Sequence, residues 1–546
     1  MRRTVPPLPP ALMLQGTCSN AGKSLLTAGL CRLLSRAGYD VAPFKAQNMS
    51  LNSFVTLDGG EMGRAQVLQA QACGLLPDVR MNPVLLKPTG DNGSQIILRG
   101  RPWGQMRARE YMAAKRRLWR TVVESYAELA QGRDLMLIEG AGSPAEINLR
   151  SGDIVNMRMA RHAGANVLLV ADIDRGGAFA ALVGTLALLT RGERALVGGL
   201  VLNKFRGDAS LLEPALEKIS ARTGKPFVGT VPWLADLGLP DEDSVSLKLS
   251  GQGASYALDD ALDGVQDRPD TLDVAFVDLP RISNATDLDA LAVEPDVRLR
   301  PVRTAAELGQ PDCLVLPGTR NTMADMRHLR ESGLAQAIVA HAGSCLATGH
   351  GCVVGICGGF QMLGRQIADP LGLEEGGTVA GLGLLPLTTT LERRKTLRQT
   401  HGHSQPPLTD IPLPVTGYEI HHGTSGFTDR ASMADTADTA GPAFAPVLTA
   451  ADGTPVGFGR TAATGRIHIL GTYLHGLFDS DSFRHAFCEQ LRQARHLPSR
   501  PATSYDVGAA LDRLADCLAA HLDMKKILAP CGLAWPPTGA KPDKMC

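Results

Sequence analysis

Aromatic residues make up only 4% of this chain of 546 residues. Proteins that bind single-stranded nucleic acid stack bases on aromatic side chains, so this content argues against such a platform. Net charge is also missing, because 55 Lys and Arg residues balance 55 Asp and Glu residues. No field of one sign therefore attracts nucleic acid or an anionic membrane. An anionic substrate has to be held by local groups instead.

Long apolar runs and paired cysteines are lacking as well. No apolar run reaches the roughly 20 residues needed to cross a bilayer. Four prolines within residues 6–10 interrupt the apolar core that a signal peptide requires. The eleven cysteines are scattered without a CxxC pair, which suits reduced thiols better than a disulfide framework or a zinc site. We therefore expect a cytoplasmic enzyme that partners neither nucleic acid nor membrane.

The length and the hydrophobic content of 44% predict two or three folded domains. In residues 1–250, short β-rich runs alternate with amphipathic helical stretches, an order that predicts a parallel, doubly wound α/β sheet. The expected strands are residues 12–15, 41–44, 135–138, 167–170, 200–202 and 227–229.

Residues 251–270 are polar and aperiodic, and we interpret them as a linker. A second doubly wound α/β domain is expected over residues 271–500, followed by a C-terminal helix and tail over residues 501–546. Its expected strands are residues 274–278, 314–316, 353–356 and 467–470. Residues 401–414, rich in Pro and polar side chains, and the ADTADTA repeat at 434–440 are expected to be surface excursions.

A phosphate-binding motif follows the first expected strand. The sequence GTCSNAGKS begins at Gly16 and precedes a helix, so glycine N–H groups and the helix N-terminus can wrap a polyphosphate. Five residues separate Gly16 from Gly22 rather than the common four, and this spacing resembles the P-loop of dethiobiotin synthetase. The alternative is an ordinary glycine-rich turn. We expect the ATP-binding residues to be Gly16, Thr17, Asn20, Gly22, Lys23 and Ser24.

Acidic residues nearby are candidates for a Mg²⁺ site. Glu139 ends a buried strand in LMLIEGAGS, and carboxylates at such strand ends lie where ligands bind in open α/β sheets. Hard oxygen ligands suit Mg²⁺ that bridges ATP phosphates. We expect Ser24, Asp58 and Glu139 to be the metal ligands, with Glu61 a weaker candidate.

The second half contains a cysteine version of the nucleophile elbow. In VVGICGGFQMLG, Cys357 lies between glycines at a strand-to-helix turn. The helix N-terminus lowers the pKa of a thiol there and offers N–H groups to an oxyanion. A buried structural cysteine is the alternative. We expect Gly358 and Gly318, which ends another strand in LPGT, to supply oxyanion donors.

A nucleophilic cysteine requires a base, and His475 follows the strand at residues 467–470 in GTYLHG. His421 and His422 in GYEIHHG are weaker candidates. From the residues alone, we expect a thiol nucleophile with its base in the second half of the chain and a site for ATP and Mg²⁺ in the first half.

Taken together, the motifs resemble those of the cobyric acid synthase family along nearly the whole chain. They are, in order, GTCSNAGKS, FKAQNMSLNS, IEGAGSPAEINL, ADIDRGG, LPGTRNT, GICGGFQMLG, GYEIHHG and GTYLHG. The stretches KAQNMSLNS and EGAGSPAEINL are the specific ones, since the P-loop and elbow alone indicate only the wider amidotransferase group.

The resemblance implies a dethiobiotin synthetase-like domain and a class I-like glutaminase domain. It implies glutamine- and ATP-dependent amidation of the b, d, e and g carboxylates of adenosylcobyrinic acid a,c-diamide, a corrinoid. It makes Cys357 the nucleophile and His475 its base. An assembly of identical subunits is compatible with it.

One position departs from the wider class I glutaminases. Their catalytic His is followed two residues later by a Glu that orients it, whereas this chain has Leu477. Asp479 and Glu419 both remain open as the third catalytic group.

Two rival functions are the related a,c-diamide synthase and a P-loop partitioning or regulatory ATPase with a degenerate amidase-like appendage. Retention of both Cys357 and His475 argues against the second.

Overall fold

The computed structural model describes residues 8–90, 93–234, 237–240, 270–427, 444–462 and 464–537. The chain divides into two compact units. The first comprises Met1–Ser50, Gly60–Glu242 and Asp506–Cys546, and the second comprises Leu51–Gly59 and Asp243–Tyr505. The expected linker, apart from Asp270, and the ADTADTA repeat lie outside the described residues.

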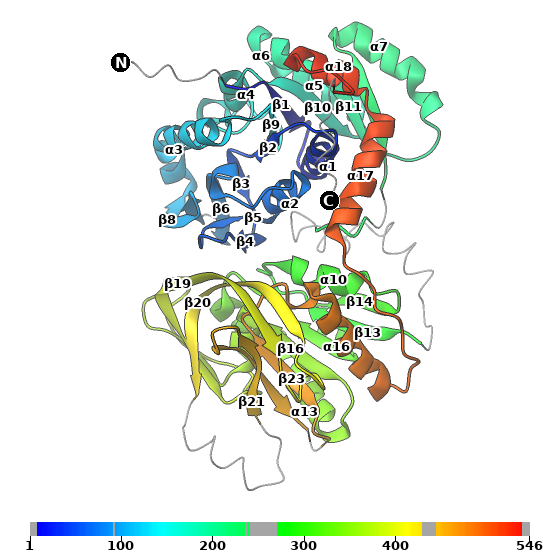
Figure 1. Ribbon diagram of the computed structural model, residues 1–546. Helices are drawn as coiled ribbons and strands as arrows, with labels where there is room; N and C mark the ends of the chain where they lie inside the picture. The colour runs from blue at the N-terminus through cyan, green and yellow to red at the C-terminus, as the bar shows by residue number, and fades with distance from the viewer. Residues whose placement is uncertain are drawn as a thin grey trace. The chain divides into compact units, whose positions relative to one another are not determined.

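A six-stranded parallel sheet forms the centre of the first unit, in the order β12-β11-β10-β1-β9-β2 (Figure 1). Its strands are β1 (Ala11–Gly16), β2 (Val41–Phe44), β9 (Leu135–Glu139), β10 (Asn166–Asp172), β11 (Val197–Phe205) and β12 (Phe227–Pro232). All six expected strands are present, most of them longer than predicted. Strands β1, β9 and β10 are buried along their whole length, as strands between two helix layers must be.

The C-terminal helices belong to this first unit. Helix α17 (Val507–His521) packs beside α1 (Lys23–Arg36), where Arg32 forms a bidentate ion pair with Asp512 at 2.8 and 2.9 Å (Figure 1). The packing is close, since a Cβ on Gly29 of α1 would lie 2.5 Å from Cδ1 of Leu518. Leucines of α17 thus share one hydrophobic core with β1 and α1.

The remaining elements of the first unit include a small sheet in the order β3-β6-β7-β8. Its strands are β3 (Gln47–Met49), β6 (Val84–Gly90), β7 (Gly93–Leu98) and β8 (Arg101–Arg107). The other elements are β5 (Glu61–Gly63), α2 (Arg64–Ala72), η1 (Val79–Met81), α3 (Ala108–Leu129), η2 (Arg150–Gly152), α4 (Met157–Ala163), α5 (Ala178–Leu188), α6 (Arg191–Leu196), η3 (Ala209–Leu212), α7 (Glu213–Thr223), α18 (Met524–Leu528) and η6 (Ala529–Cys531).

The second unit is built on an eleven-stranded sheet in the order β14-β13-β15-β16-β23-β22-β21-β19-β17-β18, with β20 paired to β19. The parallel part holds β13 (Leu272–Val277), β14 (Val297–Val302), β15 (Cys313–Leu316), β16 (Cys352–Ile356) and β23 (Ile467–Thr472), which include all four expected strands. The rest holds β17 (Gln366–Asp369), β18 (Gly377–Ala380), β19 (Leu387–Ser404), β20 (Pro414–Phe427), β21 (Phe444–Ala450) and β22 (Pro455–Thr461).

The long antiparallel hairpin of β19 and β20 is the main departure from the expected fold of this unit (Figure 1). Residues 401–414, expected to be a surface excursion, include the end of β19 and the first residue of β20. His401–Ser404 alternate exposed and buried, the period of a half-buried strand, and Gly402 lies against Thr449 of β21. Its polar composition is typical of a loop, so the strand was not predicted from the sequence.

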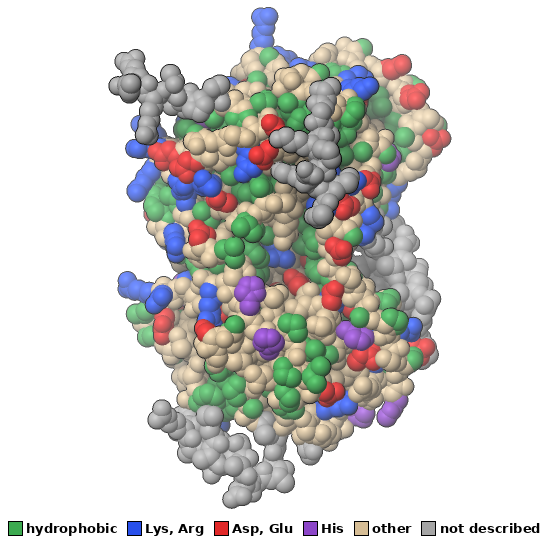
Figure 2. Space-filling view, viewed as in Figure 1, with side chains coloured by type: hydrophobic (Ala, Val, Ile, Leu, Met, Phe, Trp, Pro, Cys, Tyr) green, Lys and Arg blue, Asp and Glu red, His purple; other side chains and the backbone are tan. Residues whose placement is uncertain are grey.

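The helical elements of the second unit are η4 (Ala285–Leu288), α10 (Asp289–Ala292), α11 (Ala305–Leu308), α12 (Thr322–Glu331), α13 (Leu334–Thr348), α14 (Gly358–Leu363), η5 (Leu477–Asp479) and α16 (Asp481–Ala494). Strand β4 (Ser53–Val55) also belongs to it. Within the described part of the chain, no helix combines the length and apolarity needed to span a membrane. On the face in Figure 2, basic and acidic side chains are interspersed, in line with the balanced composition.

Candidate active sites

The P-loop connects the end of β1 to the start of α1. Its two terminal glycines lie where a side chain would not fit. A Cβ on Gly16 would fall 2.9 Å from Nζ of Lys23, and a Cβ on Gly22, whose φ is 90°, would fall 2.1 Å from Nδ2 of Asn203. The loop is therefore closely packed with Lys23 beside it, and such a glycine-rich turn lets backbone N–H groups bind a polyphosphate.

Residues of the neighbouring strands hold the loop in place. Nζ of Lys204 donates to the carbonyl of Asn20 at 2.8 Å and to Oδ2 of Asp172 at 2.9 Å. Asn203 donates to the carbonyl of Ala21 at 2.9 Å, and the N–H of Thr17 donates to the carbonyl of Val170 in β10. Asp172 lies in the ADIDRGG motif, which thereby acts on the loop through Lys204.

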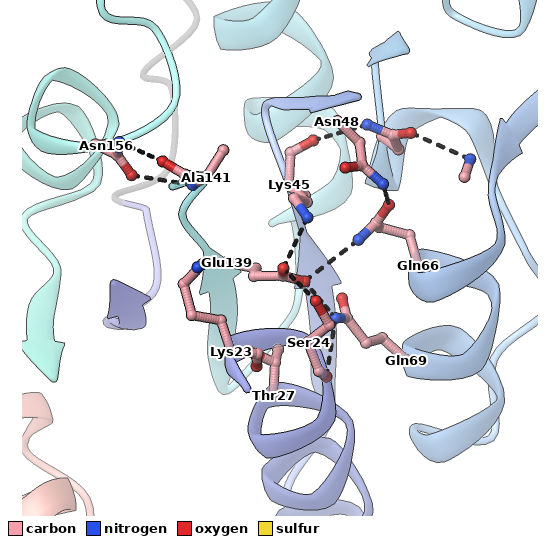
Figure 3. Close-up of polar contacts among 12 residues, drawn as sticks. Lys23, Ser24, Thr27, Lys45, Asn48, Gln66, Gln69, Glu139, Ala141 and Asn156 are labelled. Carbon is pink, nitrogen blue, oxygen red and sulfur yellow. Dashed lines mark hydrogen bonds and ion pairs between the residues drawn. The ribbon is translucent and has the colours of Figure 1, made fainter. Parts of the chain in front are cut away.

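Glu139 is the centre of a buried polar cluster beside the P-loop (Figure 3). Because β1 and β9 are adjacent and parallel, with Leu14 opposite Glu139, the carboxylate reaches the first turn of α1. Oε1 accepts from Oγ of Ser24 and from Nζ of Lys45, each at 2.7 Å. Oε2 accepts from Nε2 of Gln69 at 2.6 Å. Glu139 thus joins Ser24, in the first turn of α1, to Lys45.

The cysteine elbow lies between β16 and α14 of the second unit. Cys357 has φ of 53° and ψ of −106°, and a positive φ in a non-glycine residue costs on the order of 1–3 kcal/mol. A Cβ on Gly359 would lie 1.9 Å from the carbonyl oxygen of Leu316, and one on Gly355 would lie 2.6 Å from Leu363. The flanking glycines are thus required by close packing, and the strained turn carries the sulfur at the end of the strand.

His475 follows β23, and hydrogen bonds and a ring contact fix the orientation of its imidazole. Its Nδ1 hydrogen-bonds Oδ2 of Asp287 at 2.7 Å, and the next N–H, of Gly476, donates to Oδ1 of the same carboxylate at 2.9 Å. The ring stacks on Tyr418 with centroids 5.3 Å apart. Both His475 and Asp287 are buried.

Two neighbours set the charge of this histidine. Burial alone lowers the pKa of His475, but Asp287 and Cys357 outweigh it and raise the pKa to about 10. Nε2 has no nitrogen or oxygen partner among the described residues, and the ionisable group beside it is the Cys357 thiol. The arrangement stabilises the imidazolium form of His475 beside Cys357, the kind of partner that an activated cysteine requires.

The two expected oxyanion donors both border this pair. A Cβ on Gly318 would lie 3.2 Å from Cε1 of His475, so Gly318 is beside the imidazole. Gly358 is the first residue of α14, where the helix itself does not use the N–H group. The carbonyl of Thr472 already accepts the N–H of Cys357 at 2.8 Å, so that donor is occupied.

Known proteins match both halves of the chain. Residues 12–246 match the CobQ/CobB/MinD/ParA nucleotide binding domain, and residues 273–483 match the CobB/CobQ-like glutamine amidotransferase domain. Cobyric acid synthase of Nitratidesulfovibrio vulgaris is 51% identical and aligns over 96% of this chain and 98% of its own length. Those of Moorella thermoacetica and Desulfitobacterium hafniense are 47% identical with the same coverage.

The chain belongs to the cobyric acid synthase family. It is thus an ATP-dependent ligase with a glutamine amidotransferase domain, and its place is in cobalamin biosynthesis.

Against this family background, the third group of the glutaminase site has a definite candidate. Asp287 holds His475, and sequence analysis missed it because nothing in SNATDLDAL marks one aspartate. Of the two residues left open, Glu419 is engaged by Arg398 at 2.6 Å and Thr400 at 2.8 Å, and Asp479 lies beside Gly476. The carboxylate that the structure places on Nδ1 of His475 is that of Asp287. Leu477 is buried in the core.

In the nucleotide half, Ser24 and Glu139, two of the three expected metal ligands, are in contact. The third, Asp58, is exposed and accepts a hydrogen bond from Thr56. Glu61 pairs with Lys87 at 2.7 Å. Lys45, which pairs with Glu139, was not predicted from the sequence. It lies in the specific FKAQNMSLNS stretch, and that motif was the signal available for it.

Proposed function

We propose that this chain amidates the b, d, e and g carboxylates of adenosylcobyrinic acid a,c-diamide, with nitrogen from glutamine and energy from ATP. The observation that carries the proposal is the pairing of two sites on one chain. One unit holds a strained cysteine beside a buried His475–Asp287 pair, and the other holds a glycine cradle with Lys23 next to a buried carboxylate. A glutamine-dependent ligase of this family needs both a glutaminase site and an ATP site.

In the glutaminase unit, the Cys357 thiolate attacks the amide carbon of glutamine. His475 donates its proton to the departing nitrogen, so that ammonia leaves and a glutamyl thioester remains. His475 then takes a proton from water, which hydrolyses the thioester to glutamate and restores the thiolate. Asp287 keeps Nδ1 of His475 engaged, so that Nε2 carries the proton toward the reaction. The N–H groups of Gly318 and Gly358 receive the oxyanion.

In the nucleotide-binding unit, ATP takes the cradle of Gly16, Thr17, Asn20 and Gly22. Lys23 compensates phosphate charge as the γ-phosphoryl group moves to a substrate carboxylate. Activation is needed because a carboxylate is a poor electrophile, whereas its acyl phosphate reacts with ammonia and releases phosphate. Ammonia must arrive unprotonated, since ammonium is not nucleophilic.

The donor set beside the cradle fits Mg²⁺. Ser24 offers a hydroxyl and Glu139 a carboxylate, both hard oxygen ligands. Within the described ranges, no group of three or more His, Cys, Asp or Glu residues could hold a metal ion alone. A bound Mg²⁺ would therefore take further ligands from phosphate and water, as magnesium commonly does. It would supply charge compensation for the transferred phosphoryl group.

Along the sequence, we assign the nucleotide half to residues 1–250, the linker to 251–270, the glutaminase half to 271–500 and the C-terminal helix and tail to 501–546. Of this last part, residues from Asp506 onward join the first compact unit. We also propose that the enzyme works in the cytoplasm. Ten cysteines in the described part of the chain are unpaired, which supports a reducing compartment.

The test is mass spectrometry of an a,c-diamide corrinoid incubated with ATP and either glutamine or an ammonium salt. Each amidation replaces a hydroxyl by an amino group, so successive products are resolved by mass. We expect the wild type to use both nitrogen sources and Cys357→Ala to use ammonium only, because the thiol serves solely to liberate ammonia. A folded Cys357→Ala protein that loses both activities would contradict the two-site division. Amidation of an unamidated corrinoid instead would indicate the related a,c-diamide synthase.

A further inference from the structure

A short segment, Leu51–Gly59, belongs to one half by sequence and to the other by structure. It lies inside the span that matches the nucleotide binding domain, residues 12–246. In the structure it is part of the second compact unit, with the glutaminase residues. Its residues Asn52, Ser53, Val55 and Thr56 are buried. Its contacts with the glutaminase residues give the physical reason for this membership.

The first reason is a reciprocal pair of hydrogen bonds between two asparagines and two backbone groups. Oδ1 of Asn52 accepts from the N–H of Ala285 at 3.2 Å. Oδ1 of Asn284 accepts from the N–H of Ser53 at 3.0 Å. Ala285 begins η4, the turn that carries Asp287, and its N–H has no partner within that turn. Asn52 therefore caps, from 233 residues away, the turn that presents Asp287 to His475.

The second reason is an aromatic stack that ends on the catalytic base. The ring of Phe54 packs against Tyr418 with centroids 4.9 Å apart, and Tyr418 stacks on His475. The hydroxyl of Tyr418 accepts from Nδ2 of Asn284 at 3.3 Å, which joins the stack to the asparagine pair. The segment thus reaches His475 through its ring face as well as through Asp287.

The third contact concerns the nucleophile. Val55 shares a small buried cluster with Tyr418 and Ile420, and its carbonyl accepts from Nε2 of Gln399. The carbonyl of Ile420 faces the thiol of Cys357, with Sγ 3.7 Å from the oxygen. The strand that lies against the nucleophile is therefore packed from behind by the same segment.

We propose that Leu51–Gly59 is a positioning element of the glutaminase, and that Asn52 sets the His475–Asp287 pair in its working geometry. The proposal rests on the proposed function, because it assigns Cys357 and His475 their roles. Asn52 is a positioning residue, acting through η4. The segment lies within the span that matches the nucleotide binding domain. That span therefore supplies part of the glutaminase unit.

The test compares Asn52→Ala, Asn284→Ala and their double variant in the full-length chain. Glutamine hydrolysis gives kcat, KM and the pH profile, and ammonium-driven amidation by the same preparation reports the other site. Leu57→Ala is the matched control, because Leu57 lies in the segment but is 68% exposed. We expect each asparagine variant to lower kcat for glutamine by about 10- to 100-fold, the effect of a small misplacement of a catalytic group. KM and ammonium-driven amidation should stay unchanged.

The pH profile separates positioning from a general loss of stability. The titratable groups that face His475 are Asp287 from η4, Cys357 from the elbow and Tyr418 from β20. A misplaced Asp287 should move the basic limb of kcat to lower pH in both asparagine variants but not in Leu57→Ala. The double variant should be no worse than either single variant, because both remove the same support.

Three results would overturn the proposal. One is wild-type glutaminase activity in both Asn52→Ala and Asn284→Ala. Another is an equal loss of ammonium-driven amidation in Asn52→Ala, which would assign the segment to the nucleotide site. The third is full additivity in the double variant. Should Asn52→Ala not fold, Asn284→Ala carries the same test. Failure of the proposed function is seen separately, as glutaminase activity that survives Cys357→Ala.

Discussion

Nδ1 of His475 and Oδ2 of Asp287 lie 2.7 Å apart, although 188 residues separate them in the chain. The other oxygen of the same carboxylate accepts a hydrogen bond from the N–H of Gly476. The aspartate therefore binds both the imidazole ring and the backbone of the next residue. An anion buried with two such donors holds one orientation of the imidazole and favours its protonated form.

Asp287→Asn should therefore lower kcat for glutamine hydrolysis by roughly 100-fold or more, as loss of the orienting carboxylate does in triads. Ammonium-driven amidation should persist.

The pH dependence of the stability of Asp287→Asn provides a second readout. The folded-state pKa of His475, about 10, exceeds its ordinary value of 6.5, so its stabilisation is complete below 6.5 and is lost as pH rises toward 10. The Tm difference between wild type and Asp287→Asn should narrow over that range. Asp479→Asn is the control, and a gap that widens would contradict the assignment.

Gly359→Ala should destabilise the second unit, because the added methyl group would meet the carbonyl oxygen of Leu316 at 1.9 Å. Backbone shifts of this kind cost about 1–3 kcal/mol or more. Urea unfolding measures the effect. Gly343→Ala in helix α13 is the matched control, since nothing lies within 4 Å of its Cβ position. That variant should gain about 0.5–1 kcal/mol. Equal stabilities for the two variants would refute the close-packing explanation.

Lys23→Ala should remove amidation with glutamine and with ammonium alike. The ammonium group lies against the P-loop, donating to the carbonyl of Cys18 at 3.1 Å, and is placed to meet transferred phosphate charge. Loss of such a group costs about 100-fold or more in rate. Glutamine hydrolysis measured alone should remain. Lys218→Ala, at an exposed site on α7, is the control. An ATP-dependent rate near that of the wild type would reject the P-loop assignment.

Glu139→Gln should reduce the amidation rate, with partial recovery at high Mg²⁺ concentration if the carboxylate is a metal ligand. It should also destabilise the fold by about 3–5 kcal/mol, because Lys45 would lose its buried partner. Glu61→Gln is a matched control, as it breaks another buried Lys–Glu pair with the same 2.7 Å separation. Both variants should lose stability, but only Glu139→Gln should change the Mg²⁺ dependence. The same Mg²⁺ dependence in both would make Glu139 structural.

Partly amidated corrinoids should accumulate in solution during turnover. The chain carries one P-loop and one cysteine elbow, so each carboxylate must reach the same ATP site in turn. Carboxylates around a macrocycle point in different directions, and a large ligand reorients more easily by leaving a close-fitting site than by turning within it. A time course with substrate in large excess, followed by mass, should show intermediates in a preferred order. Detection of only the starting diamide and the final product would mean that the corrin turns while bound.

Much of the fold followed from local patterns. Buried strands such as Leu135–Glu139 read as short apolar runs, and the P-loop and elbow glycines were recognisable because their spacing reflects backbone geometry. The long hairpin of β19 and β20 was not recognised, since its polar residues alternate faces in a stretch whose composition indicates a loop.

By itself, the sequence determined the family and predicted the nucleophile and the phosphate cradle, because those features are carried by neighbouring residues in short motifs. Tertiary structure alone decided which carboxylate serves His475, that Lys45 pairs with Glu139, and that α17 packs on α1. It also decided that Leu51–Gly59 joins the glutaminase unit. The physical reason is the same in each case. A buried charge or hydrogen-bonding group takes whichever partner the packed chain brings within reach, and no local pattern records a partner that lies hundreds of residues away.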